Sequence, residues 1–230
     1  MGPLDFSVVA NALPFLLNGL LFSLELTVIG FAGGLVLGTG LALIRHLEVP
    51  IAAPIASVYI TLMRSIPLIM VLFWFFFLMP LILMWATGAS RPVPIGPVWT
   101  AFITFTLFEA AYYAEIIRAG LKAIPKGQYE ACKALAMSSA KTYRLVILPQ
   151  VLRTVSPILL TQTIILFQDT SLVYVLSLTD LLGAASKIAQ RDARLVEMYL
   201  TVAIVYMLIC SLASQMVAML RKRYAIPSRA

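Results

Sequence analysis

Long apolar runs separated by short polar segments dominate this chain. Five runs can be placed, at about residues 14–44, 51–85, 99–119, 151–178 and 195–220. The hydrocarbon core of a bilayer takes roughly 20 apolar residues per helix, so each run is long enough to cross it. The pattern predicts an all-α, polytopic membrane protein with five transmembrane helices, in which residues 1–230 form one transmembrane domain.

Composition supports the membrane class. Hydrophobic residues make up 61% of the chain and charged residues 12%, with a mean hydropathy of +0.97. A soluble domain carries about 25% charged residues. The start, "MGPLDFSVV", lacks the basic segment and cleavage site of a signal peptide, so we expect the first run to be a retained membrane helix. The two cysteines, Cys132 and Cys210, imply no disulfide framework.

The distribution of basic residues predicts the orientation. Segments 45–50, 118–153 and 221–230 together hold 12 of the 17 lysines and arginines. Cytoplasmic loops of membrane proteins carry the excess of positive charge. The N-terminus is therefore expected outside, in the periplasm, and the C-terminus inside, in the cytoplasm.

Small residues recur at every fourth position of the first run. Gly30, Gly34 and Gly38, followed by Ala42, form a bare ridge along one helix face, where another backbone can approach closely. The ridge could pack within the chain. A subunit interface is the sharper hypothesis, because a chain of five helices has little interior of its own.

Several ionisable residues lie within the apolar runs, where a charge is costly unless it is paired or faces water. They are Glu25, Arg64, Glu109, Glu115 and Asp169. Three lie beside helix-disrupting or small residues, in "MRSIPL", "FEAAYY" and "FQDTSL". Interrupted helices with polar groups at membrane depth are tolerated where they are buried in protein or line a cavity, so these segments predict a path for a small polar solute.

Structural roles remain open for these residues. Arg64 could pair with Glu109 or Asp169 as a buried ion pair. Glu115 and Arg118 are three residues apart and could form a pair on the helix surface. Tyr112, like the tyrosine after it, could simply pack against neighbouring helices.

The segment 126–150, "KGQYEACKALAMSSAKTYRLVILPQ", is polar and basic in an otherwise apolar chain. Such a helix could lie on anionic lipid. Its small residues, however, stand where a lipid-binding helix would place bulky ones, and a slim helix suits insertion into a groove of another protein. Ser138 and Ser139 are the candidate caps of the following helix, and the Leu148-Pro149 pair is expected to mark the start of the fourth span.

"EACKALAM" followed by "VILPQ" resembles the EAA loop of bacterial ABC importer permeases, whose pattern is Glu-Ala-Ala, then a glycine, then a Leu-Pro pair. Cys132 replaces the second alanine and Ala136 the glycine. "RSIPLIMVLFW", "AYYAEIIRAGLKAIPKGQYEA" and "DTSLVYVLSLTDLL" are similar to the polar amino acid uptake subfamily. Within it, the chain is most similar to permeases of glutamate/aspartate importers.

The resemblance implies a type I ABC importer permease fold in the bacterial inner membrane. It also implies a function in the uptake of a polar amino acid, with glutamate or aspartate as the expected cargo. It implies two ATP-binding cassette subunits, a homologous permease or second copy, a periplasmic amino-acid-binding protein and membrane lipid as partners, with no nucleic acid. The chain would not be an enzyme and would bind no cofactor, because ATP-Mg belongs to the ATPase.

The resemblance also implies residue roles. Substrate binding falls on Arg64, Ser65, Pro67, Phe108, Glu109, Ala110, Ala111, Tyr112, Gln168, Asp169, Thr170 and Ser171. Coupling to the ATPase falls on Gln128, Glu130, Ala131, Ala134, Leu135, Ala136 and Met137, within the cytoplasmic coupling loop 126–150.

Three other functions are compatible with parts of the sequence to different degrees. An ion-gradient-driven secondary transporter could use Glu109 or Asp169 as its ion site, but it needs no cytosolic docking helix, and the chain shows no internal repeat. A permease for glutamine, histidine or arginine would carry the same motifs. A membrane enzyme is disfavoured because no nucleophile–base set can be assembled, and no Gly-x-x-x-x-Gly-Lys-Ser/Thr loop provides an ATP site.

Overall fold

The computed structural model describes residues 4–224, with the side chains of residues 4–222, and these residues form helices and loops without a strand. The helices are α1 (Ser7–His46), α2 (Ala52–Ser65), α3 (Leu68–Phe73), η1 (Trp74–Leu78), α4 (Met79–Thr87), α5 (Pro97–Ala123), α6 (Lys126–Ala134), α7 (Ser139–Lys141), η2 (Thr142–Ile147), α8 (Leu148–Asp169), η3 (Thr170–Leu176), α9 (Leu181–Arg191) and α10 (Leu195–Tyr224). The all-α fold class is confirmed.

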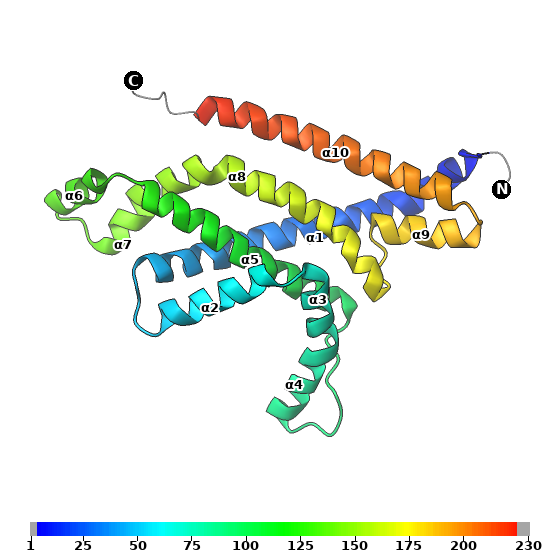
Figure 1. Ribbon diagram of the computed structural model, residues 1–230, viewed down its shortest axis with the longest axis horizontal. Helices are drawn as coiled ribbons and strands as arrows, with labels where there is room; N and C mark the ends of the chain where they lie inside the picture. The colour runs from blue at the N-terminus through cyan, green and yellow to red at the C-terminus, as the bar shows by residue number, and fades with distance from the viewer. Residues whose placement is uncertain (1–3, 225–230) are drawn as a thin grey trace.

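The long helices run along one axis of the molecule. Figure 1 shows α1, α8 and α10 aligned with that axis, with α6 and α7 at one end and α9 beside the first turns of α1 at the other. The end of α10 lies on the same side as α6. The described parts of the chain therefore put the start of α1 and the basic segment at opposite ends, as the charge distribution predicts.

Four helical segments are long and apolar enough to cross a membrane among the residues searched: Ser7–His46, Leu68–Thr87, Ser139–Leu176 and Leu195–Lys222. The third predicted span corresponds to α5, a 27-residue helix that packs along α1 and carries more polar residues. Five spans therefore remain a prediction, although the class of polytopic helical membrane protein holds.

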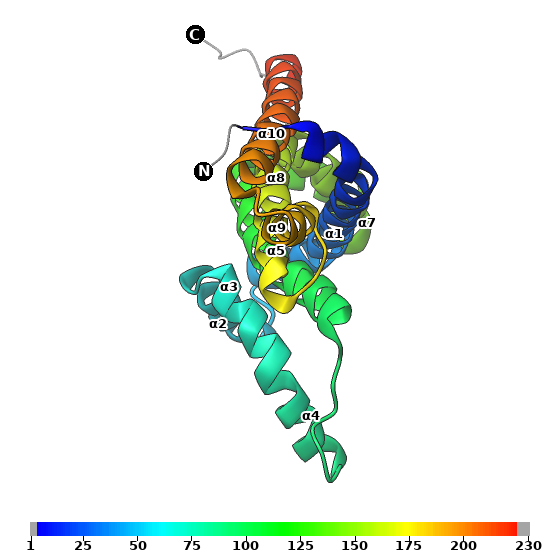
Figure 2. The ribbon, with the colours of Figure 1, turned by 90° about the vertical axis from the view of Figure 1, so that its right-hand side faces the viewer.

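The second predicted span is broken. Ile66 is extended, with φ −119° and ψ 137°, so α2 ends there and α3 starts after Pro67. Proline lacks the N–H that would continue the helix and biases the preceding residue toward extended backbone. Beyond the break, η1 and α4 contain no buried residue, and Figure 2 shows α4 projecting away from the bundle.

The glycine ridge of α1 packs inside the chain. A methyl group added at Gly38 would lie 2.8 Å from the carbonyl oxygen of Ala110, and one at Gly34 would lie 3.0 Å from Cβ of Glu109. Gly30 faces Leu166 and Phe105. The hypothesis that this ridge forms a subunit interface is wrong, because α5 already occupies the close approach that the glycines allow.

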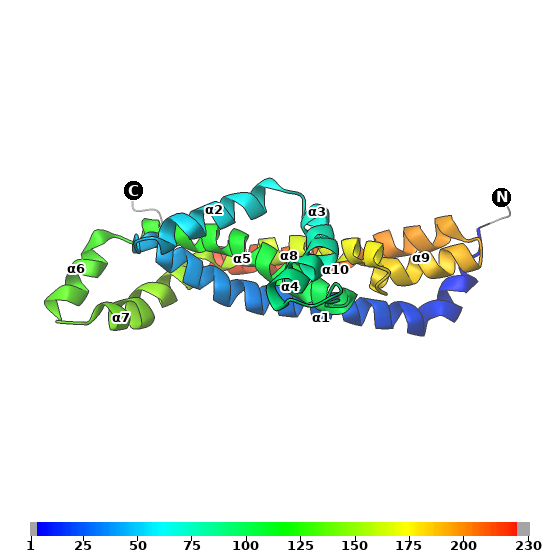
Figure 3. The ribbon, with the colours of Figure 1, turned by 90° about the horizontal axis from the view of Figure 1, so that it is seen from below.

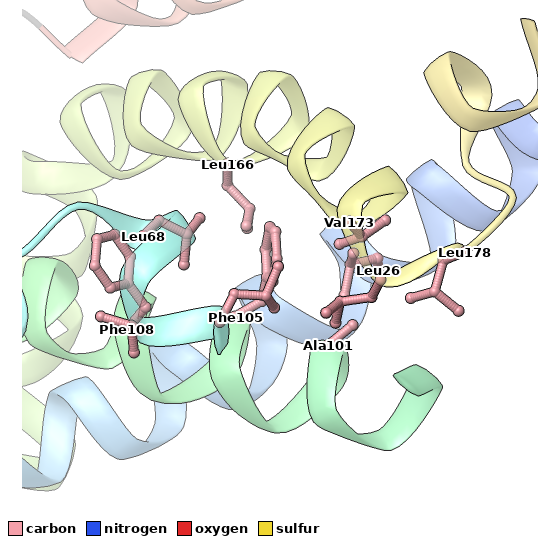
Figure 4. Close-up of a cluster of buried hydrophobic side chains, with 11 residues drawn as sticks. Leu26, Leu68, Ala101, Phe105, Phe108, Leu166, Val173 and Leu178 are labelled. Atoms are coloured by element: carbon pink, nitrogen blue, oxygen red, sulfur yellow. The ribbon is translucent and has the colours of Figure 1, made fainter. Parts of the chain in front are cut away.

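The core lies where α1, α5 and α8 meet the start of α3. Figure 4 shows Phe105 and Ala101 of α5 beside Leu26 of α1, with Leu166 above them. All four side chains are fully buried. Figure 3 shows how narrow this layer is, with α2 standing out from one side. The break at Pro67 is thus anchored directly on the core.

A short helix that the apolar pattern did not predict, α9, packs on the first half of α1. Asp180 caps it by accepting hydrogen bonds from the backbone N–H groups of Leu182 and Gly183, both at 3.0 Å. Ser23 Oγ accepts from Leu181 N–H at 3.2 Å. Burial raises the pKa of Asp180 to about 6, although the hydrogen bonds of this cap lower the pKa.

Candidate functional site

The break between α2 and α3 forms one wall of a pocket of about 470 Å3, with α5 and α8 as the others. Six predicted substrate residues line it: Arg64, Ser65, Pro67, Phe108, Tyr112 and Asp169. Gln162, Ile165 and Leu172 of α8 and η3, and residues 66, 68 and 69, complete the lining. We call it the midspan pocket, since Phe108 and Tyr112 lie near the middle of α5.

Arg64 reaches the midspan pocket from the last turn of α2. Its guanidinium carbon lies 5.5 Å from the centre of the Tyr112 ring, as in a cation–π contact. Tyr112 packs in turn against Phe108, with ring centroids 5.2 Å apart. The guanidinium is thereby oriented by a ring, while its N–H donors remain available to a ligand.

Asp169 faces the same pocket from the last residue of α8, where the helix tightens into the 3-10 turns of η3. Gln162, Ile165, Asp169 and Leu172 follow a helical spacing, so they share one face. Gln162 was missed by the sequence reasoning. The polar triplet Thr161-Gln162-Thr163 within an apolar run was the signal that could have found it.

Glu109 lies behind the pocket instead of in it. Its side chain is 1% exposed, and its Oε1 accepts a hydrogen bond from Gln162 Nε2 at 3.2 Å. Its Oε2 is buried and makes no hydrogen bond to the described residues. Gln162 therefore connects the pocket surface to a buried carboxyl group that lies outside the lining.

Five other predicted substrate residues lie outside the midspan pocket, so the structure does not support direct contact through it. Ala110 and Ala111 are fully buried, the first against Gly38 and the second in a cluster with Ile60. Gln168 is exposed outside the lining, the Thr170 hydroxyl donates a hydrogen bond to the Phe167 carbonyl oxygen of α8, and Ser171 is half-buried. These five predictions of direct substrate contact are not supported because the residues lie on other faces of α5, α8 and η3.

The structure also decides two of the open structural roles. Among the described side chains, no carboxylate lies within 4.0 Å of Arg64, so the hypothesis of a buried pair with Glu109 or Asp169 is wrong. Glu115 does pair with Arg118. Its Oε2 also accepts a hydrogen bond from Nη1 of Arg45 in α1, at 2.6 Å. This group ties the ends of α1 and α5 together.

The midspan pocket thus presents a cation and an anion to one space. A guanidinium matches the two oxygens of a carboxylate, and a carboxylate accepts hydrogen bonds from an ammonium group. Tyr112 and Gln162 add neutral polar groups, and Phe108 an apolar surface. The arrangement is suited to holding a zwitterion by complementary charge.

A second candidate surface lies on α6, at the basic end of the molecule. Gln128, Glu130, Ala131, Ala134, Leu135 and Ala136 are exposed, and 74% of Leu135 is accessible. Ser138 caps α7, and α8 begins at Leu148 followed by its proline, as expected. Met137 differs from the others, because it points to the inner side of the segment and lines a separate pocket.

Comparisons with known proteins place the chain in context. Residues 49–226 match the family model described as binding-protein-dependent transport system inner membrane component. A glutamate/aspartate import permease protein of Escherichia coli O6:H1 is 45% identical over 221 residues, which cover 96% of this chain and 98% of that protein. A glutamine transport system permease protein of Escherichia coli K12 is 33% identical over 222 residues, covering 96% and 98%.

A solved structure is also similar along nearly the whole chain. The crystal structure of an amino acid ABC transporter with histidines superposes with a TM-score of 0.82 at 27% sequence identity. The match covers 96% of this chain and 100% of that one. The fold and the family therefore agree across the described residues.

Proposed function

Because this chain belongs to the family of binding-protein-dependent transport system inner membrane components, we propose that it is the membrane subunit of an ATP-driven amino acid importer whose cargo is glutamate or aspartate. The observation that carries the proposal is the midspan pocket, where Arg64 and Asp169 face one space. A relative that imports glutamate and aspartate, 45% identical over nearly its full length, supports the choice of cargo.

Arg64 would bind the side-chain carboxylate or the α-carboxylate of the amino acid through its paired N–H donors. Asp169 would accept from the α-ammonium group. Tyr112 holds the guanidinium in place, and Gln162 is held by Glu109. No bond is made or broken in this site, so the chain acts by binding and by changing the side from which the pocket is reached.

Energy for that change would come from separate ATPase subunits that bind ATP-Mg. The exposed, slim face of α6 supports docking of such a subunit, because its alanines allow close approach and Leu135 offers an apolar anchor. Movement of α6 would reach the pocket through α5, which precedes it directly, and α8, which follows it.

A second permease subunit would complete the assembly. The arm formed by η1 and α4 has no buried residue and exposes Trp74, Phe77 and Trp85. Glu25 is also exposed, at the middle of α1. A carboxylate facing lipid at that depth is costly, which supports a protein contact there. The periplasmic binding protein would deliver cargo at the end that holds α9.

The proposal is tested by uptake into proteoliposomes that contain the chain with its ATPase and binding protein. Radiolabelled glutamate should accumulate only when ATP is supplied, and ionophores that collapse ion gradients should leave uptake unchanged. An ion-gradient-driven secondary transporter would give the opposite result. Competition by unlabelled aspartate, glutamine, histidine and arginine then ranks the cargoes.

Docking through α6 is tested with Glu130→Lys, which reverses a charge on the exposed face. We expect the variant to lose stimulation of ATP hydrolysis by loaded binding protein. Lys141→Gln, on the neighbouring α7, is the control and should behave as the unmodified chain. Normal ATPase recruitment and normal stimulation in the Glu130→Lys complex would contradict the assigned docking face.

A further inference from the structure

A pocket of about 600 Å3 lies at the basic end of the molecule, on the inner side of α6. It is bounded by the last residues of α1 and α5, by α6, and by the start of η2. Figure 1 shows α6 and α7 extending past the ends of α1 and α5 at this place. We call it the basal pocket; it lies far along the bundle from the midspan pocket.

Three lysines line the basal pocket: Lys122, Lys126 and Lys133. Within the described part of the chain, no carboxylate lies within 4.0 Å of their ammonium groups, and no acidic residue lines the pocket. The nearby arginines differ, because Arg45 and Arg118 share Glu115. The pocket therefore gathers three lysines that form no ion pair among the described residues.

The remaining lining combines a rigid aromatic wall with hydroxyl donors. His46 lies 6.4 Å from Tyr129 and 6.1 Å from Tyr143, and the two tyrosine rings are 6.0 Å apart, centroid to centroid. Ser139 and Thr142 contribute hydroxyl groups. Apolar side chains of residues 47, 121, 124 and 137 cover the rest. The lining thus suits an anion that carries an apolar part.

The number of lysines favours a phosphate. The lysine ammonium group is a compact charge that binds phosphate oxygens, and a phosphate offers several oxygens to the three lysines of this pocket. Basic pockets between membrane helices on the cytoplasmic side bind phospholipid headgroups, and the basal pocket lies where α1 and α5 end.

We propose that the basal pocket binds a phosphate group, as carried by the headgroup of an anionic phospholipid. The phosphate would contact Lys122, Lys126 and Lys133, and the apolar lining would receive the first carbons of the acyl chains. Such a ligand touches α1, α5 and α6 together. If α6 docks an ATPase, as in the proposed function, occupancy would fix α6 relative to the spans and raise the coupling of ATP hydrolysis to transport.

Binding is tested on the purified full-length chain in detergent, without ATPase or cargo, so the result is independent of the proposed function. The chain is titrated with short-chain phosphatidylglycerol and, separately, with short-chain phosphatidylcholine, and affinity is measured by thermophoresis. The variant Lys126→Gln/Lys133→Gln should bind phosphatidylglycerol about 10- to 30-fold more weakly, given about 1 kcal/mol for each lysine. Lys141→Gln removes one positive charge outside the lining and should change affinity less than about two-fold.

Two further titrations identify the source of the phosphate. Inorganic phosphate that binds with the same dependence on Lys126 and Lys133, while phosphatidylglycerol does not bind, would keep the phosphate site but assign it to a soluble ligand. If Lys141→Gln lost half as much binding free energy as the double variant, the proposal would be overturned, because each lysine would then contribute equally and the attraction would be a diffuse surface charge. Binding of glutamate in place of either phosphate compound would also overturn it.

Discussion

The close approach of α1 and α5 can be tested by adding a single methyl group. In Gly38→Ala the new Cβ would lie 2.8 Å from the Ala110 carbonyl oxygen, 2.9 Å from Cβ of Tyr113 and 3.0 Å from the backbone nitrogen of Ala114. Two of these three atoms belong to the backbone of α5, so no side-chain rotation relieves the contact. The helices must move apart.

Overpacking of this kind costs about 1–3 kcal/mol, and alanine in a helix returns about 1 kcal/mol relative to glycine. Gly40 is the matched control, since it lies on the same helix and has nothing within 4 Å of an added Cβ. For a chain of this size, 1 kcal/mol shifts Tm by about 2–4 °C. The net loss of about 0–2 kcal/mol should lower Tm by up to about 8 °C in Gly38→Ala, whereas Gly40→Ala should raise Tm by up to about 4 °C.

Both variants can be melted in detergent with a thiol-reactive or scattering readout. Equal Tm values for Gly38→Ala and Gly40→Ala would refute the reasoning. That result would mean that α5 does not occupy the ridge, and the ridge would again be available to another subunit.

Other features of the structure predict measurable effects as well. Ala136 has φ 50°, a left-handed conformation that costs about 1 kcal/mol for a residue with a Cβ, so Ala136→Gly should slow amide hydrogen exchange in α6, whereas Ala134→Gly inside the helix should speed it. Exchange that changes in the same direction in both variants would contradict the left-handed conformation of Ala136. Burial raises the pKa of Asp180 to about 6 from 3.8, so the folded chain holds this proton more tightly and Asp180 stabilises the fold below about pH 4, an effect lost as pH rises through 6. Tm should therefore fall more between pH 4 and pH 6.5 in the unmodified chain than in Asp180→Asn, which keeps the cap; identical pH profiles would be evidence against the buried carboxyl group.

Local chemistry made part of the structure predictable. Pro67 predicted the helix break that forms the midspan pocket, and Ser138 predicted the N-terminal cap of α7. Both predictions were possible because each residue acts on the backbone beside it. The positions of Arg64 and Asp169 in apolar runs identified them as site candidates. These inferences required no knowledge of which helix packs against which.

Helix facing was not predictable from the apolar runs. In α5, Phe108 and Tyr112 are four residues apart and face the midspan pocket, whereas Ala110 and Ala111 between them face α1 and α2. A span surrounded by lipid and protein can be apolar on every face, so its sequence carries little periodic signal. For the same reason, the sequence did not predict that α5 packs on the glycine ridge or that Gln162 lines the midspan pocket.

ATP-driven glutamate uptake by the Asp169→Asn complex tests the central claim most directly. The variant keeps the size of the side chain and removes the charge that would accept from the α-ammonium group. Loss of a hydrogen bond to a charged group costs about 1.5–3 kcal/mol, so uptake at limiting glutamate should fall about 10- to 100-fold while ATPase recruitment is unchanged. Gln168→Asn, one residue away and outside the pocket, should transport normally. Uptake by Asp169→Asn at the rate of the unmodified complex would contradict the account.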